Sequence, residues 1–431
     1  MKSRKVIGLQ YLKDFSSLFF SNILQKIFGV IREPIIAYFF GSSLIFAHYL
    51  LLKTAADFFS QFTVGNALRA NLLPKFTKIY NEHKNVSLNQ VSVFSRKSML
   101  YLFLFSQIFQ SAIILYLDTD YTIQLFIVSV FLSVILCFNF YNTIYLTIMQ
   151  SQGKFLKYSL ASTLNAFVVV GLIFPITKAF LITIGFIWSI LGLVFSRLLG
   201  ILSLTIAYIL PMSKEDKGFE VVINKKDFNL SILLLGNFAN IIIISSRFIS
   251  GADGSDNITY FTYSVFLLNA VLTAIISNFN TLLLKRLSLK KELKFVFYSA
   301  LIALLLGICM VFTIDIYAQD IIALIFERGK FNSTDSLKTA YYLQNIAVPF
   351  VLIFVSTIMF QPFFASKGEK FIKDSKLLAL SFIVVLISGF IFLSFTKMKP
   401  FTESLIMLYL LSITSIVISI IALYKSHKYE E

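Results

Sequence analysis

Several charged side chains stand inside long apolar runs of this sequence, where a purely structural helix would be apolar. If such a run crosses a bilayer, a charge at its centre costs about 2.5–3.5 kcal/mol on insertion scales unless it faces water or a partner. Basic residues outnumber acidic ones in this set, and a guanidinium suits phosphate because it offers paired N–H donors. The pattern predicts a binding site for an anionic substrate, formed by Lys26, Arg32, Glu33, Lys53, Asp57, Arg197 and Arg247.

Some members of this set also have a plainer interpretation. Lys53 and Asp57 are four residues apart, which is the spacing of an ion pair within one helix. Arg247 lies near the end of its run, where a long side chain can reach the interface, whereas Arg197 lies close to the middle of its run. We expect Arg247 to reach the interface, and we leave Lys53 and Asp57 open between a structural pair and substrate binding.

The first run combines its charges with a proline. Lys26 and Arg32 are six positions apart, so on a helix they point about 120° apart. Glu33 follows Arg32 and is placed to pair with a neighbour, and Pro34 predicts a kink or local unwinding just after it. Amide side chains could add donors to the site or simply link helices: Asn22, Gln25, Asn237 and Asn240.

Motifs for other chemistries are missing from the sequence. There is no GxxxxGK[ST] loop, and the three histidines have no zinc-ligand spacing. Cys137 and Cys309 lie inside apolar runs, so we expect buried free thiols. We interpret Asp118 and Asp120 as part of a solvated turn and not as carboxylates for glycosyl transfer. The expectation is a non-enzymatic protein without a cofactor or metal.

Composition places the chain in a membrane. It has 431 residues, of which 57% are hydrophobic and only 14% are charged, and its mean hydropathy is +0.81. Its formal charge of +16 is spread over short loops beside apolar runs, which argues against a nucleic-acid partner. Runs of about 20 apolar residues match the thickness of a bilayer. We place twelve spans at 15–40, 43–66, 98–117, 122–148, 158–176, 180–210, 229–250, 257–283, 294–317, 336–365, 374–396 and 402–424.

The loops between these runs differ in charge. Most lysines and arginines fall in the two termini and in every second loop, whereas the alternate loops are poor in them. Because cytoplasmic loops are enriched in basic residues, we expect both termini to be cytoplasmic, in a bacterial inner membrane. The long connection at 211–228 divides the chain into an N-terminal six-helix lobe, 1–210, and a C-terminal six-helix lobe, 229–431. The hairpins near residues 41 and 251 share a late Arg, a Gly/Ser turn and an aromatic start to the next span.

The segment IIALIFERGKF at 321–331 is amphipathic and lies in a predicted outer loop. It predicts a separate interfacial helix before the tenth span, with Glu327 and Arg328 facing water.

Four stretches form an ordered set of motifs over most of the chain. The first hairpin, LQKIFGVIREPIIAYFFGSS, has a basic residue, a Gly and an Arg–acid pair before a Phe-Gly turn. IIALIFERGKFNSTDS contains an LFERGxF…D pattern, with Ile in place of the first Leu. MQSQGKFLKYSLASTLNAF and FQPFFASKGEKF connect or end later spans. Together these motifs resemble the MurJ/MviN family of lipid II flippases, in the multidrug/oligosaccharidyl-lipid/polysaccharide flippase superfamily.

The resemblance implies a V-shaped pair of six-helix lobes, alternating access, and a central cationic cavity for the diphosphate and sugars of a polyprenyl-linked precursor. Lys26 stands where the family usually has Arg, and Arg32 and Glu33 keep the Arg–acid pair. The sequence departs from the family at Ala47, near Ser60 and Gln61, and near Ser264, where the family has an Asp, paired Arg and an Arg. The family also commonly has fourteen spans, the last two forming a groove for the lipid tail.

The sequence therefore predicts an all-α integral membrane protein with about twelve transmembrane helices in two six-helix lobes around a central cavity. The predicted function is a flippase for a saccharide linked to an undecaprenyl-type diphosphate, which is moved from the inner to the outer leaflet. Lipid II, an O-antigen unit and an exopolysaccharide unit stay open as substrates. A cation-coupled exporter and a polyprenyl-lipid glycosyltransferase or ligase are the alternatives. We expect a monomer in contact with membrane lipids, and coupling to the membrane potential or to a monovalent ion is open.

Overall fold

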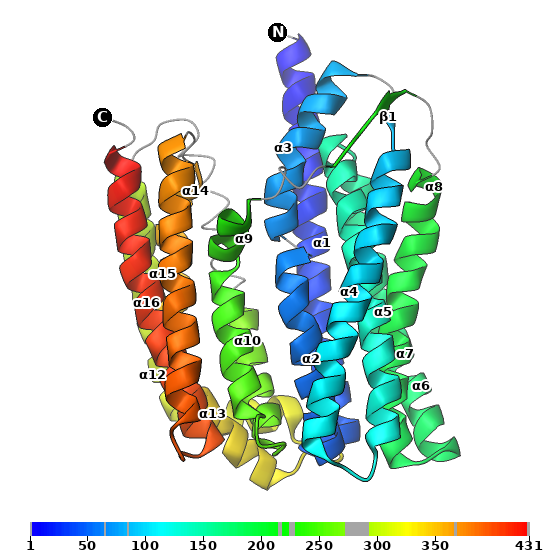
Figure 1. Ribbon diagram of the computed structural model, residues 1–431, viewed down its shortest axis with the longest axis vertical. Coiled ribbons are helices and arrows are strands. Elements are labelled where there is room, and N and C mark those ends of the chain that lie inside the picture. The colour runs from blue at the N-terminus through cyan, green and yellow to red at the C-terminus, as the bar shows by residue number, and fades with distance from the viewer. Residues whose placement is uncertain are drawn as a thin grey trace. The chain divides into compact units, whose positions relative to one another are not determined.

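The computed structural model is helical along most of the chain (Figure 1). It describes residues 2–63, 66–83, 86–213, 218–223, 229–271, 293–365 and 369–428. The first half contains α1 (Lys2–Phe40), α2 (Leu44–Thr63), α3 (Asn66–Glu82), α4 (Asn89–Leu117), α5 (Thr122–Ser151), α6 (Phe155–Thr183), α7 (Phe186–Leu204) and α8 (Leu210–Ser213). The second half contains α9 (Leu230–Gly236), α10 (Phe238–Ser250), α12 (Leu293–Phe326), α13 (Ser333–Met359), α14 (Gln361–Ala365), α15 (Glu369–Ser394) and α16 (Pro400–Lys428). Residues 257–271 are also helical.

Many of these helices are long and apolar enough to cross a membrane. Within the described ranges there are eight such helices, and α9 with α10 makes a ninth if the pair, bent by 69°, is one broken span. The eight exclude α1 and α2, which carry five of the predicted site residues. Each predicted span falls on helical residues, although the seventh and tenth each cover two consecutive helices, the sixth begins inside α6, and the eighth is described only as far as residue 271. The chain is a multi-pass membrane protein of the predicted all-α class.

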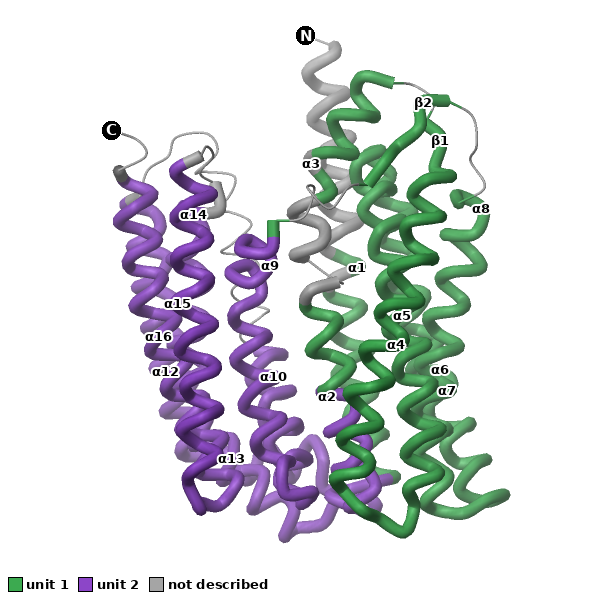
Figure 2. The backbone as a smooth tube through the Cα atoms, in the orientation of Figure 1, with its two compact units in different colours: residues 1–39, 55–229 green, residues 40–54, 230–431 purple. Residues whose placement is uncertain are grey.

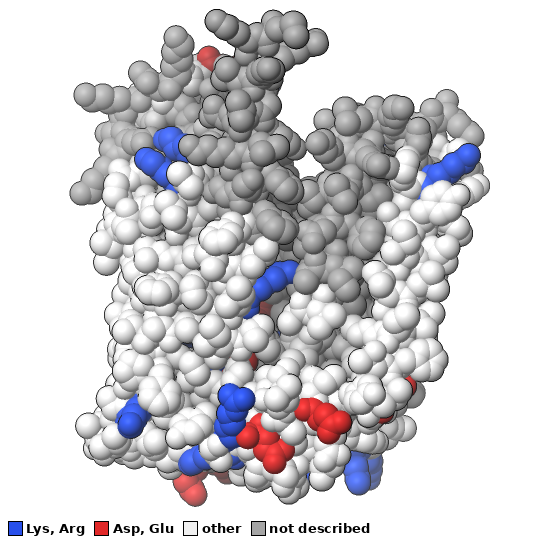
Figure 3. Space-filling view, turned by 180° about the vertical axis from the view of Figure 1, so that it is seen from behind, with Lys and Arg blue, Asp and Glu red and all other residues white. Residues whose placement is uncertain are grey.

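The surface agrees with contact with lipid. Large apolar side chains such as Leu115, Phe312 and Leu324 are more than half exposed, as expected where lipid tails replace water. On the face drawn in Figure 3, most charged side chains gather at the lower end, whereas a few stand in the middle and near the top among uncharged ones. Cys137 is buried but Cys309 is exposed on α12, so the prediction of two buried thiols is wrong for Cys309. An apolar run does not reveal which of its faces meets lipid.

The helices form two compact units, each discontinuous in sequence (Figure 2). The first unit comprises residues 1–39 and 55–229, and the second comprises 40–54 and 230–431. The second unit therefore includes the turn after α1 and the first half of α2. The sequence-based lobes 1–210 and 229–431 stay a prediction, because parts of the connection between them, 214–217 and 224–228, lie outside the described residues.

In the first unit, the described part of that connection is anchored by a short sheet. Strand β1 (Val86–Ser87) pairs in parallel with β2 (Phe219–Glu220), with Val86 opposite Phe219. The Lys75 ammonium donates to the Val222 carbonyl at 2.6 Å. Apolar side chains after β2 join the buried cluster under α3 and α4, whose members include Leu72, Phe76, Leu88, Val91, Val221 and Ile223. Burial of these side chains holds residues 218–223 on the first unit.

Helices α6 and α7 pack closely through glycine. A Cβ placed on Gly192 would lie 2.6 Å from the Thr177 Cα, and one placed on Gly200 would lie 2.5 Å from a Val169 methyl. Small residues let membrane helices approach at backbone distance, which increases their van der Waals contact. The hairpin therefore depends on the missing side chain at position 192, because its neighbour there is rigid backbone.

The structure corrects the expected interfacial helix at 321–331. Residues up to Phe326 continue α12, and a short turn then leads to α13. Asp315 and Asp320 lie on exposed positions of this helix, which continues past the predicted end of the span at residue 317. Glu327 and Arg328 are exposed, as predicted.

Replacing Gly192 by Ala should destabilise the first unit. We expect the free energy of unfolding in detergent micelles to fall by about 1–3 kcal/mol, because the new methyl forces α6 and α7 apart. Gly171→Ala on α6 is the matched control, since a Cβ there meets nothing within 4 Å. Equal stability of the two variants would show that this close approach does not limit packing.

Candidate functional site

Two charged residues of the first apolar run, Arg32 and Glu33, form an ion pair on α1. The Arg32 guanidinium donates to one oxygen of Glu33 from both Nε, at 3.0 Å, and Nη2, at 2.5 Å. The Arg32 side chain is 33% exposed and that of Glu33 is 11% exposed. The carboxylate therefore offsets part of the free energy required to place the guanidinium in the span, while a third of the Arg32 side chain stays accessible. α1 runs through Pro34 as one helix, so the alternative of local unwinding there is wrong.

Polar contacts fix the face of α1 just before this pair. The Gln25 amide donates to Ser21 and Ser162 at 3.0 Å each, and Ser21 also contacts Thr163 at 2.9 Å. Gln25 is thus used to link α1 with α6. Lys26 is half-buried, and as the next residue on the helix it lies about 100° around from Gln25.

The other predicted site residues are half-buried and divided between the two units. Asp57 and Arg197 belong to the first unit together with Lys26, Arg32 and Glu33, whereas Lys53 and Arg247 belong to the second. Arg32 and Glu33 are brought into direct contact. The role of Lys53 and Asp57 stays open between the two interpretations, and Arg247 lies in the last turn of α10, as a side chain near the interface would.

Two of the departures from the family pattern are occupied by hydroxyls that bond to backbone. Ser264 is buried and donates to the Thr339 carbonyl at 2.9 Å, and Ser60 donates to the Asp57 carbonyl at 2.8 Å. Both serine hydroxyls are therefore used in hydrogen bonds to backbone, and neither supplies the positive charge that an arginine would bring.

The sequence analysis missed a polar cluster in the second unit, centred on Asp335. This side chain is 5% exposed and accepts hydrogen bonds from Ser42 at 2.6 Å and from the Tyr260 hydroxyl at 3.2 Å. Asp335 and Asn332 also form a reciprocal capping box at the start of α13. The spacing Asn332-x-x-Asp335 was the signal in the sequence that could have revealed it. We call Ser42, Asp256, Tyr260, Asn332, Asp335 and Lys338 the Asp335 cluster.

The cluster balances charge around one hydroxyl. Tyr260 lies 2.8 Å from Asp256 as well as 3.2 Å from Asp335, so its single proton serves one carboxylate at a time. The Lys338 ammonium lies 3.9 Å from Asp256 and 5.1 Å from the centre of the Tyr260 ring. The cation offsets part of the repulsion between the two carboxylates.

The same region explains two of the sequence motifs. Gly41, in the Phe-Gly turn, has φ of +53°, and a Cβ there would lie 2.5 Å from the Lys330 carbonyl oxygen. Phe331 is buried and packs edge-on against Tyr263 at 5.4 Å. The first-hairpin motif and the FERGKF motif therefore meet in one unit although they are far apart in sequence.

His48 adds a contact between the hairpins near residues 41 and 251, which have similar sequences. Its Nε2 lies 2.8 Å from the Gly254 carbonyl oxygen, and because a carbonyl only accepts, Nε2 carries the proton. The side chain is 5% exposed. His48 therefore links α2 to the turn that follows α10.

The described residues contain no group of three or more His, Cys, Asp or Glu side chains that could hold a metal ion. The pair on α1 and the half-buried cations can bind an anion by charge and N–H donation. None of these groups is arranged as a nucleophile with its base.

Solved structures of membrane transporters are similar to this chain. A structure of the lipid II flippase MurJ in an inward closed conformation matches with a TM-score of 0.69 and 17% identity, covering 97% of this chain and 87% of that chain. An inward-facing multidrug resistance MATE family transporter of the MOP superfamily matches with a TM-score of 0.53 and 14% identity, covering 95% of this chain and 93% of that chain. Neither a family model nor a curated protein sequence matches the chain.

These similarities define the class of fold. The chain has the fold of the membrane transporters grouped in the MOP superfamily. Within that class, its similarity is higher to the MurJ structure than to the MATE structure, so the predicted resemblance to MurJ-type flippases is confirmed for the fold.

Loss of the Asp335 carboxylate should destabilise the second unit. Asp335→Ala removes a helix cap and leaves Ser42 without this partner, so we expect the free energy of unfolding to fall by about 2 kcal/mol or more. Ser42→Ala removes one hydrogen bond and should cost about 1 kcal/mol. Chemical unfolding in micelles measures both.

The control is Asp320→Ala, which truncates an exposed acid on α12 and should change stability by less than about 0.5 kcal/mol. A loss for Asp335→Ala no larger than that of the control would contradict the structural role of the cluster.

Proposed function

We propose that this protein is a flippase for a saccharide carried on a polyprenyl diphosphate, which it moves from the cytoplasmic to the outer leaflet by alternating access. The proposal covers lipid II and related lipid-linked glycans. The protein makes and breaks no covalent bond in this process. The similarity in fold to a lipid II flippase supports the proposal.

The observation that carries the proposal is the Arg32–Glu33 pair within α1. A partly exposed guanidinium on a carboxylate partner is stable enough to stand in a span and can still donate to a diphosphate. In this proposal Arg32 and Lys26 hold the diphosphate, and Lys53 and Arg197 add further positive charge. Glu33 positions Arg32, and Asp57 limits the local excess of charge.

The orientation inferred from the loop charges completes the proposal. Both termini lie in the cytoplasm of a bacterium, and the chain spans the inner membrane. A membrane potential that is negative inside then favours outward movement of an anion by about 2.3 kcal/mol per charge per 100 mV. This contribution can drive export without a nucleotide.

A cation-coupled exporter of small molecules is the second candidate, and the similarity to a MATE transporter favours it. Such a protein needs acidic side chains that exchange a cation for the substrate. Glu33 and Asp57 are the acids of the predicted site that this alternative would use. Loss of Asp57 should therefore abolish transport by a cation-coupled exporter but leave most of the activity of the proposed flippase.

Arg32→Gln should slow translocation of a fluorescent polyprenyl-diphosphate glycan in reconstituted vesicles at least tenfold. The reason is that charge-assisted hydrogen bonds contribute about 1.5–3 kcal/mol each. Arg32→Lys keeps the charge but loses the paired donors, so we expect an intermediate rate. Arg328→Gln, at an exposed arginine of the turn before α13, is the control and should transport normally. Unchanged transport by Arg32→Gln would overturn the proposed role of this residue.

Transport should also respond to voltage. A potassium gradient with valinomycin can make the side of the vesicle membrane that corresponds to the cytoplasm negative. Translocation of the anionic lipid from that leaflet to the opposite one should then accelerate. Reversing the gradient should slow it. Rates that are independent of both gradients would show that no net charge moves with the substrate.

A further inference from the structure

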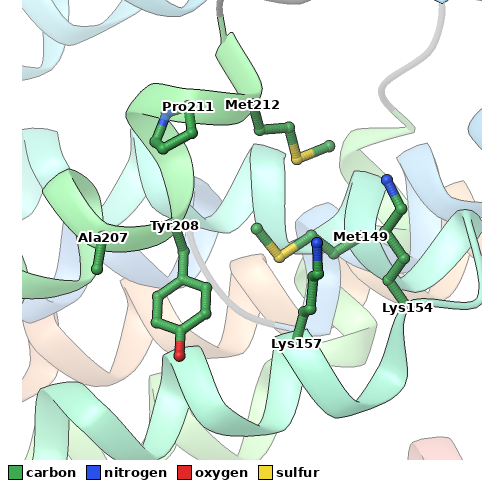
Figure 4. A pocket seen from close by; sticks show the side chains of 7 residues that line it. All are labelled: Met149, Lys154, Lys157, Ala207, Tyr208, Pro211 and Met212. Atoms are coloured by element: carbon green, nitrogen blue, oxygen red, sulfur yellow. The ribbon is translucent and has the colours of Figure 1, made fainter.

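A small cavity lies in the first unit at the end predicted to be cytoplasmic, away from the pair on α1 (Figure 4). Its volume is about 270 Å³. Residues from the α5–α6 connection and from the helices after α7 line it, among them Met149, Lys154, Lys157, Tyr208, Pro211 and Met212. The proposed transport function assigns no role to this cavity.

A local change of helix type shapes one wall. Pro211 cannot donate an N–H and its ring would clash with the Ala207 carbonyl in a regular α-helix. The chain instead forms a π-helical turn over Thr205–Ile209, in which the Leu210 N–H donates to the Thr205 carbonyl. Such turns are often found at functional sites. Here the turn places Tyr208 in the cavity wall.

The opposite wall is basic. Lys154 precedes the first turn of α6 and Lys157 follows within that turn, and both side chains are exposed. Figure 4 shows their ammonium groups side by side, near the side chains of Met149 and Met212. The positive end of the α6 dipole adds to their charge. Among the described residues that line the cavity none is acidic, and the charged ones are Lys154 and Lys157.

The remaining lining is apolar, and together with the small volume it limits the chemistry and the size of a ligand. The side chains of Met149 and Met212 are buried, and with Pro211 they offer a surface for hydrocarbon beside the two ammonium groups. The volume is below the about 300–1,000 Å³ of sites for drug-sized ligands, so a sugar chain does not fit whereas a single phosphate headgroup does. A phosphate next to hydrocarbon is the chemistry of an anionic lipid at the membrane surface.

We propose that this cavity binds the phosphate of an anionic phospholipid from the cytoplasmic leaflet. Lys154 and Lys157 bind the phosphate, and the part of the acyl chain nearest to the headgroup packs against Met149 and Met212. The lipid is a bound partner and not the transported substrate. The Tyr208 side chain lines the wall opposite the lysines, and its hydroxyl points away from their ammonium groups, so the proposal gives it no contact with the phosphate. The site is independent of Arg32, so this proposal and the proposed transport function can fail separately.

The test is native mass spectrometry of the full-length protein in detergent with added phosphatidylglycerol, compared with phosphatidylcholine. The wild type should retain phosphatidylglycerol preferentially, and Lys154→Gln with Lys157→Gln should reduce its retention at least fivefold. Replacing both lysines by Arg should preserve binding, which separates loss of charge from loss of folding. The matched control is Lys373→Gln with Lys376→Gln, two exposed lysines at the same spacing on α15.

The proposal would be overturned if the Lys154/Lys157 double variant retained as much phosphatidylglycerol as the wild type. It would also be overturned if the Lys373/Lys376 control lost as much phosphatidylglycerol as the Lys154/Lys157 variant. Complete displacement of phosphatidylglycerol by millimolar inorganic phosphate would assign the cavity to a free anion. A preference for farnesyl diphosphate through the same lysines would assign it to the transported lipid. Each of these last two results would overturn the phospholipid assignment.

Discussion

The free energy required to hold a charge within a bilayer is the constraint on which this structure depends. α1 meets it by placing Glu33 directly after Arg32, so that both Nε and Nη2 donate to one carboxylate oxygen. Gln25 and Ser21, about two and three turns earlier on α1, attach this helix to α6 and so limit its rotation. The ion pair does not bury Arg32 completely, because a third of the arginine side chain stays exposed. Stability and a capacity to bind anions therefore come from the same two residues.

Elsewhere the fold is held by contacts that bring distant segments together. Residues 40–54 cluster with the C-terminal helices because Gly41 admits the Lys330 carbonyl, Ser42 reaches Asp335, and His48 reaches Gly254. In the first unit, the α6–α7 approach at Gly192 and the β1–β2 pairing perform the same task. Both units use small residues and buried hydroxyls where apolar packing alone gives little direction, since lipid tails are as apolar as the helix surfaces.

Hydropathy was sufficient to predict the helices and the membrane class, because a span of this length has few alternatives in a bilayer. The long-range links were beyond the sequence. Ser42 and Asp335 are 293 positions apart, and a hydroxyl or carboxylate carries no mark of its partner. The ninth span was predicted to end at residue 317, whereas α12 continues past the exposed acids Asp315 and Asp320 to Phe326. By contrast, the capping box at Asn332 and Asp335 and the proline behind the π turn were readable signals. A partner for Glu33 was expected from the sequence, whereas its identity as Arg32 and the degree of exposure of Arg32 required coordinates.

The central claim is that position 32 combines a membrane-embedded location with access to water and to an anionic lipid. It is tested most directly by thiol labelling of Arg32→Cys in vesicles, in a background where Cys137 and Cys309 are replaced by Ala. A thiol reacts as its thiolate, which forms only where water reaches it. The account predicts labelling by a charged, membrane-impermeant reagent at position 32, and slower labelling when a polyprenyl diphosphate is added. Absence of labelling at position 32, while a cysteine at the exposed position of Asp120 reacts, would contradict it.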